Sequence, residues 1–598
     1  MATIVLSAAG AALGSSIGGG FLGLSSVVIG RAVGAIAGSV IDQKIMGDGS
    51  QAVETGRVDR FRLTSASEGT PIPRVWGRMR LGGQVIWASR VREVAEAVDE
   101  GAGGGGLGKG VLTGTASSSG AVEYHYYQSF ALGLCEGEIA RVGRVWIDGA
   151  EVAPSELNMR VYTGSQTQSP DPKIEAVEGA GNVPAYRGTA YVVIEELDLT
   201  AYGNRIPVFN FEVIRPEQPD QTAEVARGTK AVALIPGTGE YALATTTVHA
   251  GDLPGQKDPQ NEHTPLGKTD FAVSLDMLDG ELPSLEAVSL VVSWFGDDLR
   301  CGSCEIAPKV ERNDGDGHEM PWTVCGLGRA SAGLVPFDDD NRPVYGGTPT
   351  DQSVIEGIRA LQDTGKAVTF YPFVLMTQMA GNGLIDPWTG TPDQPVLPWR
   401  GRITTSLAPG VSGSPDGTAA AAAEVANFFG TAQVSDFSLD GETVVYTGPN
   451  EWSYRRFILH YAFLCQAAGG VEAFLIGSEL RALTQIRGAG DSFPVVDALV
   501  TLAGDVRSVL GAGTKISYAA DWSEYFGYHP TDGSNDVFFH LDPLWADPDI
   551  DFIGIDNYMP LSDWRDGDDH ADASYGSIYN LDYLQANVLG GEGYDWYY

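Results

Sequence analysis

The stretch AFLIGSEL, residues 473–480, decides the fold of the second half of the chain. Its first five residues are apolar or glycine, without the polar alternation of a half-exposed strand. A strand that is apolar at nearly every position is buried on both faces, which is typical of a parallel sheet covered by helices. Glu479 comes where this strand ends. The stretch therefore predicts a strand of an α/β domain with a carboxylate at its carboxyl end.

Similar apolar runs precede and follow this stretch, and segments with helical spacing separate them. This alternation over residues 229–598 favours a (β/α)8 barrel over a doubly wound sheet, because several strand ends carry polar and aromatic residues. A seventh strand is not evident before Tyr598, so we expect an incomplete barrel and a longer polypeptide. The other predicted strands are 231–237, 287–295, 367–375, 515–522 and 551–558, and the clearest helices are 418–429, 452–468 and 495–513.

The predicted strand ends combine aromatic rings with carboxylates. In a barrel of parallel strands, these ends meet at one mouth. Aromatic faces beside carboxylates suit stacking against sugar rings and hydrogen bonding to their hydroxyls. The pattern indicates a glycan ligand, for which we predict the contact residues Trp294, Asp521, Trp522, Asn557 and Tyr558. The carboxylates at the same strand ends are Asp297, Asp298, Glu479 and Asp556.

Residues 49–228 show a different pattern, with short alternating runs separated by glycine and proline. Val208, Phe209, Phe211 and Val213, around polar Asn210 and Glu212, are typical of a half-buried strand. We therefore predict mainly antiparallel β domains here, with a flexible Gly/Ser-rich loop at 100–120. The runs that carry this prediction are 68–90, 124–149, 190–199 and 204–216.

The first 48 residues are apolar and rich in glycine. No charged residue occurs between Ala2 and Gly30, which is long enough for a helix to cross a bilayer. Glycines at every fourth position would give a helix a smooth stripe for close packing against another helix. The pattern predicts a helix that packs with copies of itself and can enter a membrane; an apolar terminus that is simply packed or poorly ordered is the other interpretation. The helix-packing glycines are Gly10, Gly14, Gly18, Gly30, Gly34 and Gly38.

The composition excludes some classes of function. With 38 basic and 77 acidic residues, the chain has a formal net charge of −39, which argues against a nucleic-acid-binding surface. The five cysteines are too few and too scattered for a disulfide framework. Cys301 and Cys304 have the spacing of half a zinc site, but no second pair completes it. We expect no metal and no cofactor.

Several phrases in the β-rich region carry a resemblance to a known family. The order and spacing of these phrases, followed by the predicted barrel, resemble the tail-tip (host-specificity) hub proteins of phages. Over essentially residues 1–598 the chain is most similar to the large "megatron" baseplate protein of gene transfer agents and related siphophages. The phrases are Glu68-Gly-Thr-Pro-Ile-Pro, Val75-Trp-Gly, Gly82-Gly, Leu134-Cys-Glu-Gly-Glu-Ile, Ile147-Asp-Gly and Gly203-Asn-Arg-Ile-Pro.

This resemblance implies a homotrimeric structural hub at the distal tip of a tail, bound to other baseplate proteins. It implies a virion component that closes the tail tube, contacts host glycan and membrane, and lets DNA pass during delivery. Under this hypothesis, segment 1–48 plugs the tube and is released into the membrane. An acidic channel would not hold the passing DNA.

The barrel also resembles glycoside hydrolases, in which a glutamate after the fourth strand is the general acid. That position is Glu479, although Ser478 precedes it where many of those enzymes have asparagine. Hydrolysis needs a second carboxylate, for which Asp556 and Glu592 are the candidates. Whether the barrel is catalytic stays open at this point. The alternatives to a tail hub are a free or membrane-anchored glycoside hydrolase and an adhesin that only binds glycan.

Overall fold

The computed structural model describes residues 71–97, 122–215, 225–237, 239–250, 258–524, 527–530, 533–558, 562 and 564–590, and two short strands before them. These strands, β1 (Gly20–Phe21) and β2 (Leu24–Ser25), pair antiparallel, so strand pairing replaces the predicted helix at these four residues. The six glycines of the predicted stripes, the loop 100–120 and Glu592 lie outside the described residues. None of the helices within the described ranges combines the length and apolarity needed to cross a bilayer.

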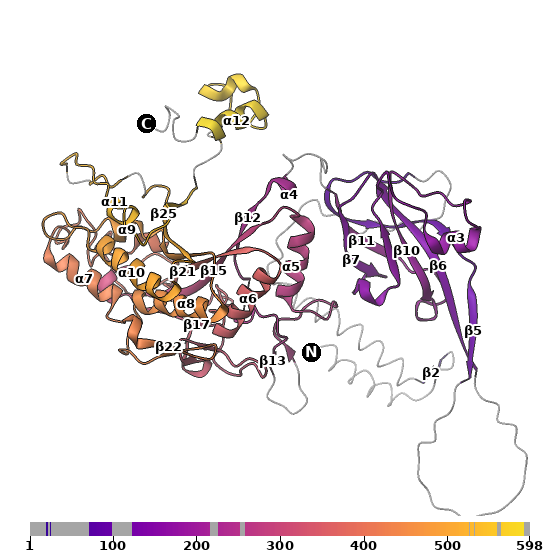
Figure 1. The fold of residues 1–598 in the computed structure, drawn as a ribbon, viewed down its shortest axis with the longest axis horizontal. Coiled ribbons are helices and arrows are strands. Elements are labelled where there is room, and N and C mark those ends of the chain that lie inside the picture. The colour runs from indigo at the N-terminus through magenta and orange to yellow at the C-terminus, as the bar shows by residue number, and fades with distance from the viewer. Residues whose placement is uncertain are drawn as a thin grey trace, which may run out of the picture. The chain divides into compact units, whose positions relative to one another are not determined.

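Residues 63–598 form one compact unit, which opens with antiparallel β structure (Figure 1). One sheet has the order β4-β6-β10-β9, with β5 also paired to β6, and a second sheet has the order β3-β11-β7-β8. The prediction of antiparallel β structure is confirmed, whereas the predicted domain boundaries at 48 and 228 stay predictions. The strands are β3 (Gly77–Gly82), β4 (Gln84–Ala88), β5 (Arg92–Ala97), β6 (Val122–Glu136), β7 (Arg141–Ile147), β8 (Ala150–Val152), β9 (Met159–Tyr162), β10 (Thr189–Asp198) and β11 (Phe209–Arg215).

The two sheets share one apolar core. Phe130 of β6 and Phe209 of β11 meet across it, with ring centroids 5.7 Å apart. Phe209 and Phe211 share the core-facing side of β11, as predicted. Glu212, on the opposite side of the strand, is also buried. The Glu212 carboxylate accepts a hydrogen bond from the backbone N–H of Arg144 at 3.2 Å, which satisfies it within the protein.

The second half of this unit contains a curled parallel sheet with the order β12-β15-β21-β24-β25-β26. Each pairing in this path is parallel, and β16 (Ile306–Ala307) adds antiparallel to β15. All the strands predicted for the barrel are therefore present, in the predicted order, as an open part-barrel with β12 and β26 at its edges. Their bounds are β12 (Ala231–Leu234), β15 (Ala287–Gly296), β21 (Ala367–Met376), β24 (Ala473–Ser478), β25 (Lys515–Asp521) and β26 (Gly554–Asp556).

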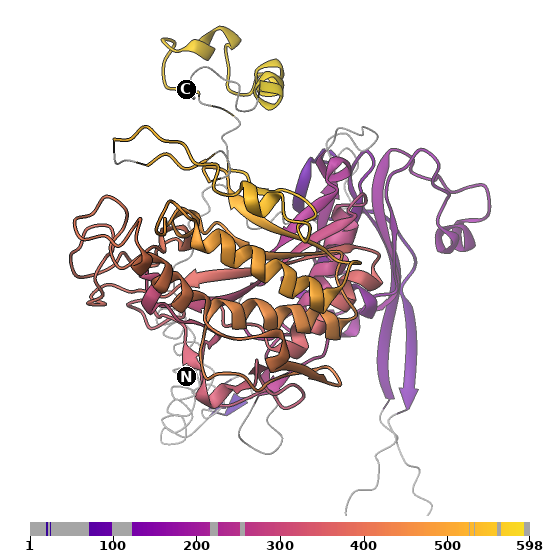
Figure 2. The ribbon, with the colours of Figure 1, turned by 60° about the vertical axis from the view of Figure 1, so that its left-hand side comes forward.

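Helices cover the outer face of this sheet, and α8 and α10 lie side by side across it (Figure 2). The long helices are α5 (Asp270–Glu281), α6 (Asp351–Asp363), α7 (Ala419–Phe429), α8 (Tyr454–Ala468) and α10 (Pro494–Leu510). The shorter ones are α3 (Pro172–Glu178), α4 (Val225–Gly228), α9 (Arg481–Thr484), α11 (Asp542–Trp545) and α12 (Leu581–Gly590). Short strands in the connections are β13 (His249–Ala250), β14 (Asp258–Pro259), β17 (Lys309–Val310), β18 (Thr323–Val324), β19 (Leu327–Gly328), β20 (Gly333–Leu334), β22 (Phe437–Asp440) and β23 (Thr443–Tyr446).

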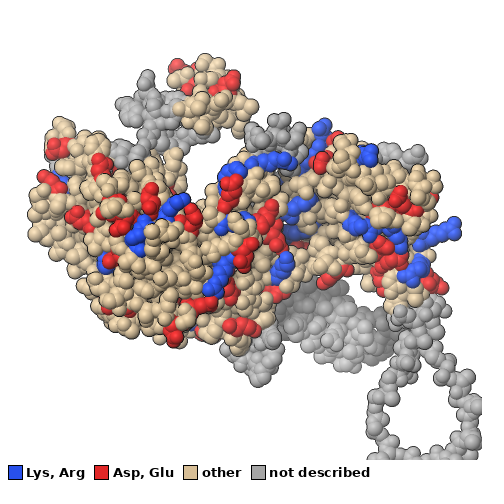
Figure 3. Space-filling model, viewed as in Figure 1, with Lys and Arg blue, Asp and Glu red and all other residues tan. Residues whose placement is uncertain are grey.

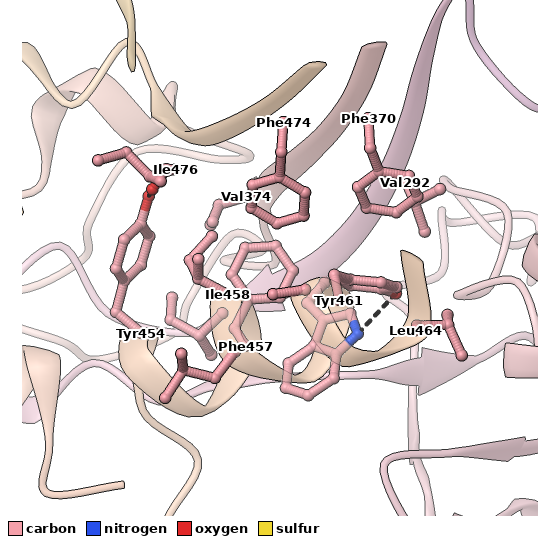
Figure 4. Close-up of a cluster of buried hydrophobic side chains, with 14 of the residues drawn as sticks. Val292, Phe370, Val374, Tyr454, Phe457, Ile458, Tyr461, Leu464, Phe474 and Ile476 are labelled. Atoms are coloured by element: carbon pink, nitrogen blue, oxygen red, sulfur yellow. Dashed lines mark hydrogen bonds between the residues drawn. The ribbon is translucent and has the colours of Figure 1, made fainter. Parts of the chain in front are cut away.

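The main core lies between the sheet and α8. Figure 4 shows Phe370 and Phe474, from two neighbouring strands, facing Phe457 and Tyr461 of the helix. Along β21 the burial alternates, with Phe370 fully buried toward the helices and Tyr371 half-buried on the inner side. The inner side of the strands is therefore the side on which a mouth can form.

Charges of both signs are interspersed on the face shown in Figure 3. The surface carries ion pairs such as Arg342 with Asp338, at 3.1 Å. Exposed pairs of this kind each contribute about 0–1 kcal/mol to stability. They keep the surface polar and do not decide the fold.

Candidate functional site

Glu479 follows β24 directly, at an irregular point of the sheet. The pairing of β24 with β25 shifts register between Leu475 and Ser478, which is a β-bulge. Gly477 lies within the bulge, where an added Cβ would stand 2.2 Å from the hydroxyl oxygen of Tyr454. Glu479 has a left-handed φ of 48°, and its backbone N–H donates to the carbonyl of Ala519 at 2.9 Å. The chain therefore turns sharply here and holds the glutamate inside the mouth of the part-barrel.

The residue Glu479 is 4% exposed, and its side chain is held by two neighbours from one loop. Its Oε2 atom accepts a hydrogen bond from Trp399 Nε1 at 2.7 Å and lies 3.0 Å from Arg400 Nη2. Arg400 is buried and also donates to the backbone carbonyl of Ser478 at 2.9 Å and to its hydroxyl at 3.0 Å. Its guanidinium stacks on the ring of Phe373, 3.7 Å from the centroid. Glu479 therefore forms a buried ion pair with Arg400, whose Nε and Nη2 atoms both have partners.

Asp556 ends β26, and its carboxyl interacts electrostatically with that of Glu479. The Tyr371 hydroxyl donates to Asp556 Oδ2. Burial and the neighbouring Glu479 carboxylate raise the pKa of Asp556 to about 6, although the Tyr371 hydrogen bond opposes this rise. The structure thus brings the two predicted carboxylates together, and one of them retains its proton well above its usual range.

The second oxygen of Glu479, Oε1, is buried and accepts no hydrogen bond within the described residues. Oε2 accepts from Trp399 and pairs with Arg400, so Glu479 has one oxygen without a donor among these residues. Ionisation of Asp556 would add a second negative charge near this carboxylate, which the raised pKa of Asp556 reflects.

Two partly exposed aromatic rings flank the carboxyl pair. Trp399 is 37% exposed and Tyr558 is 66% exposed, and both contact Glu479. Burial and the Glu479 carboxylate raise the pKa of Tyr558 to about 12. Asn557, between Asp556 and Tyr558 in the chain, is exposed. Trp522 is half-buried, and its backbone N–H donates to the Asp556 carbonyl at 3.1 Å. This arrangement offers ring faces and hydrogen-bonding groups to a polar ligand.

Two predicted contact residues are unavailable to a glycan, and the structure corrects them. Trp294 is fully buried between the sheet and α8, where its Nε1 donates to Tyr461 Oη at 2.9 Å (dashed line in Figure 4). Asp521 is buried and accepts hydrogen bonds from the backbone N–H and the hydroxyl of Ser523, so it fixes the turn after β25. Trp294 shares the side of β15 that faces the helices, and the expected orientation toward the mouth was wrong.

The carboxylates after β15 are loop anchors. Asp298 is buried, pairs with Arg300 at 2.5 Å and accepts from Gln394 at 2.7 Å. Asp297 accepts from the backbone N–H of Glu305 at 2.9 Å, and burial raises its pKa. Both carboxylates therefore hold the connection after β15.

Sequence reasoning missed Tyr371, Trp399 and Arg400. Tyr371 lies inside a predicted strand, and the other two lie in the long irregular connection between β21 and α7. A signal was present in this connection, because Trp388, Trp399, Arg400 and Arg402 gather there in a proline- and glycine-rich sequence. Aromatic and arginine residues in a loop after a barrel strand are typical of a binding mouth.

Two other polar features lie apart from this pair. A cavity of about 620 Å³ lies beside the end of β12, where Arg329 pairs with Asp316 at 3.0 Å, and Glu479 and Asp556 are not among its lining residues. Within the described ranges, no three His, Cys, Asp or Glu side chains are placed to hold a metal ion. Cys301 and Cys304 are buried free thiols, and burial raises the pKa of Cys304 to about 12.

Comparisons with known proteins identify the barrel region. Residues 452–598 match the family model described as "GTA TIM-barrel-like domain". A chain of the solved structure "Virion of native gene transfer agent (GTA) particle" is 52% identical, with a TM-score of 0.23, and the match covers 39% of this chain and 44% of that one. A comparison with curated proteins gives no match.

Two structures of GH113 beta-1,4-mannanase also match, at 16% and 17% identity, with TM-scores of 0.22 and 0.25. These matches cover 52% and 55% of this chain and 59% and 64% of those chains. The chain thus spans less than two thirds of each of these three solved chains. The family match supports the resemblance found in the sequence: residues 452–598 are similar to the TIM-barrel-like domain of gene transfer agents.

Proposed function

We propose that this chain is a structural component of a gene transfer agent particle, located in the baseplate at the distal tip of the tail, and that its part-barrel binds glycan on the recipient cell. The family match of residues 452–598 and the phrases of the β-rich region support the first part. The carboxyl pair between partly exposed aromatic rings supports the second.

The observation that carries the glycan proposal is the placement of Glu479 and Asp556 between Trp399 and Tyr558. Sugars present apolar C–H faces that stack on aromatic rings and hydroxyls that need polar partners. Asp556 and the Tyr558 hydroxyl are polar groups at this mouth, and Trp399 and Tyr558 supply the ring faces. Glu479 and Arg400 are buried, so they position the site and do not offer a contact surface.

The same geometry favours binding over hydrolysis. A general acid must reach the leaving-group oxygen of its substrate to protonate it. The expected general acid, Glu479, is buried, and its Oε2 is held by Trp399 and Arg400.

A glycoside hydrolase is the second candidate, and one observation favours it. Asp556 is half-buried and retains a proton to about pH 6, as a general acid does. Incubation of the chain with envelope glycan and measurement of new reducing ends separates the two functions. Turnover that is lost in Asp556→Asn would establish hydrolysis, whereas binding without new reducing ends would establish a binding domain.

The remaining parts of the proposal concern assembly and delivery. The chain would form a homotrimeric hub with other baseplate proteins, and its apolar segment 1–48 would close the tube and enter the host membrane. DNA would pass through the hub without binding to it, since the net charge of −39 disfavours phosphate contacts. The glycine stripes and the charge support this part.

Particle association is tested by sedimentation of native tailed particles and mass-spectrometric counting of this chain against the tube protein. About three copies per particle are expected for a trimer. A chain found only in the free pool would refute the virion role. Deletion of residues 2–46 is expected to leave assembly intact and to block DNA delivery, and normal delivery would refute the membrane role of that segment.

Glycan binding is tested by presenting recipient-cell envelope glycan to the full chain. Trp399→Ala is expected to lower affinity by about tenfold or more, because it removes a stacking face. Asp497→Asn, on the exposed side of α10, is the matched control and is expected to bind as the unchanged chain does. Equal affinity of all three proteins would refute the assignment of the site.

A further inference from the structure

We propose that the sugar bound between Trp399 and Tyr558 carries a free ammonium group, as a de-N-acetylated amino sugar does, and that this ammonium pairs with Asp556. The inference rests on the proposed glycan function and names the ligand class of the same site. It follows from the charges at the mouth, from one buried oxygen and from the flanking rings.

Asp556 is the carboxylate of the pair that has no cation of its own. The ion pairs found among the described residues include Glu479 with Arg400 and none that involves Asp556. Arg400 pairs with Glu479, and its charge also lowers the pKa of Asp556, so one cation faces two carboxylates. When both carboxylates are ionised, the mouth has one uncompensated negative charge, which a ligand cation can neutralise.

The unpartnered Oε1 of Glu479 strengthens the argument. This oxygen is buried, belongs to a side chain that is 5% exposed, and lacks a donor. Burial, and after it the repulsion of the nearby Glu479 carboxylate, keeps a proton on Asp556 above its usual range. A cation on the accessible side of Asp556 would offset this repulsion, so the site is arranged to favour a positive ligand over a neutral one.

The aromatic rings favour the same ligand. An ammonium group near the face of a tryptophan or tyrosine is attracted by the cation–π interaction. Trp399 and Tyr558 both contact Glu479 and are partly exposed, so an amino sugar seated between them would reach Asp556 with its ammonium. A sugar with an acetylated amine would keep the stacking and lose the charge.

The pH dependence follows from the groups that face Asp556. These are Tyr371 from β21, Glu479 from the end of β24, Arg400 from the loop before α7, and Tyr558 beyond β26. Of these groups, only Asp556 has a pKa moved to about 6. Ammonium binding requires its ionised form, so affinity should rise about tenfold between pH 5.0 and 6.8, where an amine with a pKa near about 7.7 is still mostly charged.

The test is calorimetric titration of the full chain with a glucosamine tetramer and with an N-acetylglucosamine tetramer, at pH 5.0 and 6.8 and at constant ionic strength. We expect the glucosamine tetramer to bind at least tenfold more tightly at pH 6.8 and to lose most of that advantage at pH 5.0. Asp556→Asn should abolish both the preference and the pH dependence, whereas Asp497→Asn should preserve them. The pH profile of the unchanged chain is informative even if a variant fails to fold.

Each other outcome has a distinct meaning. Equal affinity for the two sugar tetramers would overturn the ammonium inference and leave the glycan proposal standing. Binding of neither sugar by a folded chain would count against the glycan proposal itself. Tetralysine binding as tightly as the glucosamine tetramer would show charge attraction without sugar recognition, which also overturns the inference.

Discussion

Replacement of Asp556 by asparagine should stabilise the chain at alkaline pH, even though it removes a group of the proposed site. In the folded chain the pKa of Asp556 is raised from 3.8 to about 6 by burial and by Glu479. Its protonated form is therefore the one that folding favours. The associated stability is fully present below pH 3.8, is lost as pH rises toward about 6, and is absent above that value.

The magnitude follows from the size of the shift. A rise of about two pH units corresponds to about 3 kcal/mol, and partial solvent exposure of the carboxyl reduces this to about 1–2 kcal/mol. Asparagine has the shape of the neutral acid. Its carbonyl can accept from Tyr371, and it carries no negative charge to repel Glu479. Asp556→Asn should therefore equal the unchanged chain near pH 4 and exceed it by about 1–2 kcal/mol at pH 8.

The assay is thermal unfolding of the full chain and of Asp556→Asn at a series of pH values between 4 and 8. The difference between the two proteins is the relevant quantity, because the other titrating groups cancel in it. A variant that is less stable at pH 8, or a difference that does not change with pH, would refute the coupling of the two carboxylates. Asp497→Asn should show no such pH-dependent difference.

Three further substitutions probe the surroundings of the site. Arg400→Gln leaves the buried Glu479 carboxylate without its cation and should cost about 3–5 kcal/mol, measured by thermal unfolding with Arg400→Lys as the conservative comparison. Asp351→Asn removes the partner of the fully buried His460, at 2.8 Å, and should cost a similar amount at neutral pH. Burial opposes protonation of His460, but Asp351 outweighs it and raises the pKa to about 10, so the penalty should fade as pH approaches that value. Gly477→Ala places a Cβ against a buried hydroxyl and should cost about 1–3 kcal/mol in the same assay; an unchanged melting temperature would show that the bulge can relax.

The strands of the part-barrel could be predicted because each is a short apolar run with a polar residue at its end. The meeting of Glu479 and Asp556 followed from the same pattern, since parallel strands bring their carboxyl ends to one mouth. The direction of individual side chains was harder to predict. Trp294 lies two residues after Val292 and four after Leu290, and both of these face the helices. Because alternate residues of a strand point to the same side, the sequence could have predicted that Trp294 faces the helices as well.

The residues that complete the site could not be placed from periodicity. Trp399 and Arg400 lie more than twenty residues beyond the end of β21, at the start of a single 3-10 turn (Arg400–Arg402) in a long irregular connection. Their position depends on the path of that loop, which is fixed by contacts such as the Trp388 Nε1 hydrogen bond to the Arg402 carbonyl at 2.9 Å. Composition can indicate that such a loop binds something, but it cannot tell which carboxylate the loop will reach.

The carboxyl pair depends on the irregularity at the end of β24. In a regular strand, neighbouring residues point to opposite faces, yet Ser478 and Glu479 both contact Arg400. The bulge makes this possible, because the three residue steps from Leu475 to Ser478 on β24 span the distance of two steps, from Ser517 to Ala519, on β25. The left-handed backbone at Glu479 then returns its carboxylate to the mouth. Such a conformation is costly and persists where surrounding contacts enforce it. Here the Arg400 hydrogen bonds and the Glu479 N–H bond to β25 enforce it, so the arrangement of the two carboxylates is built into the fold before any ligand binds.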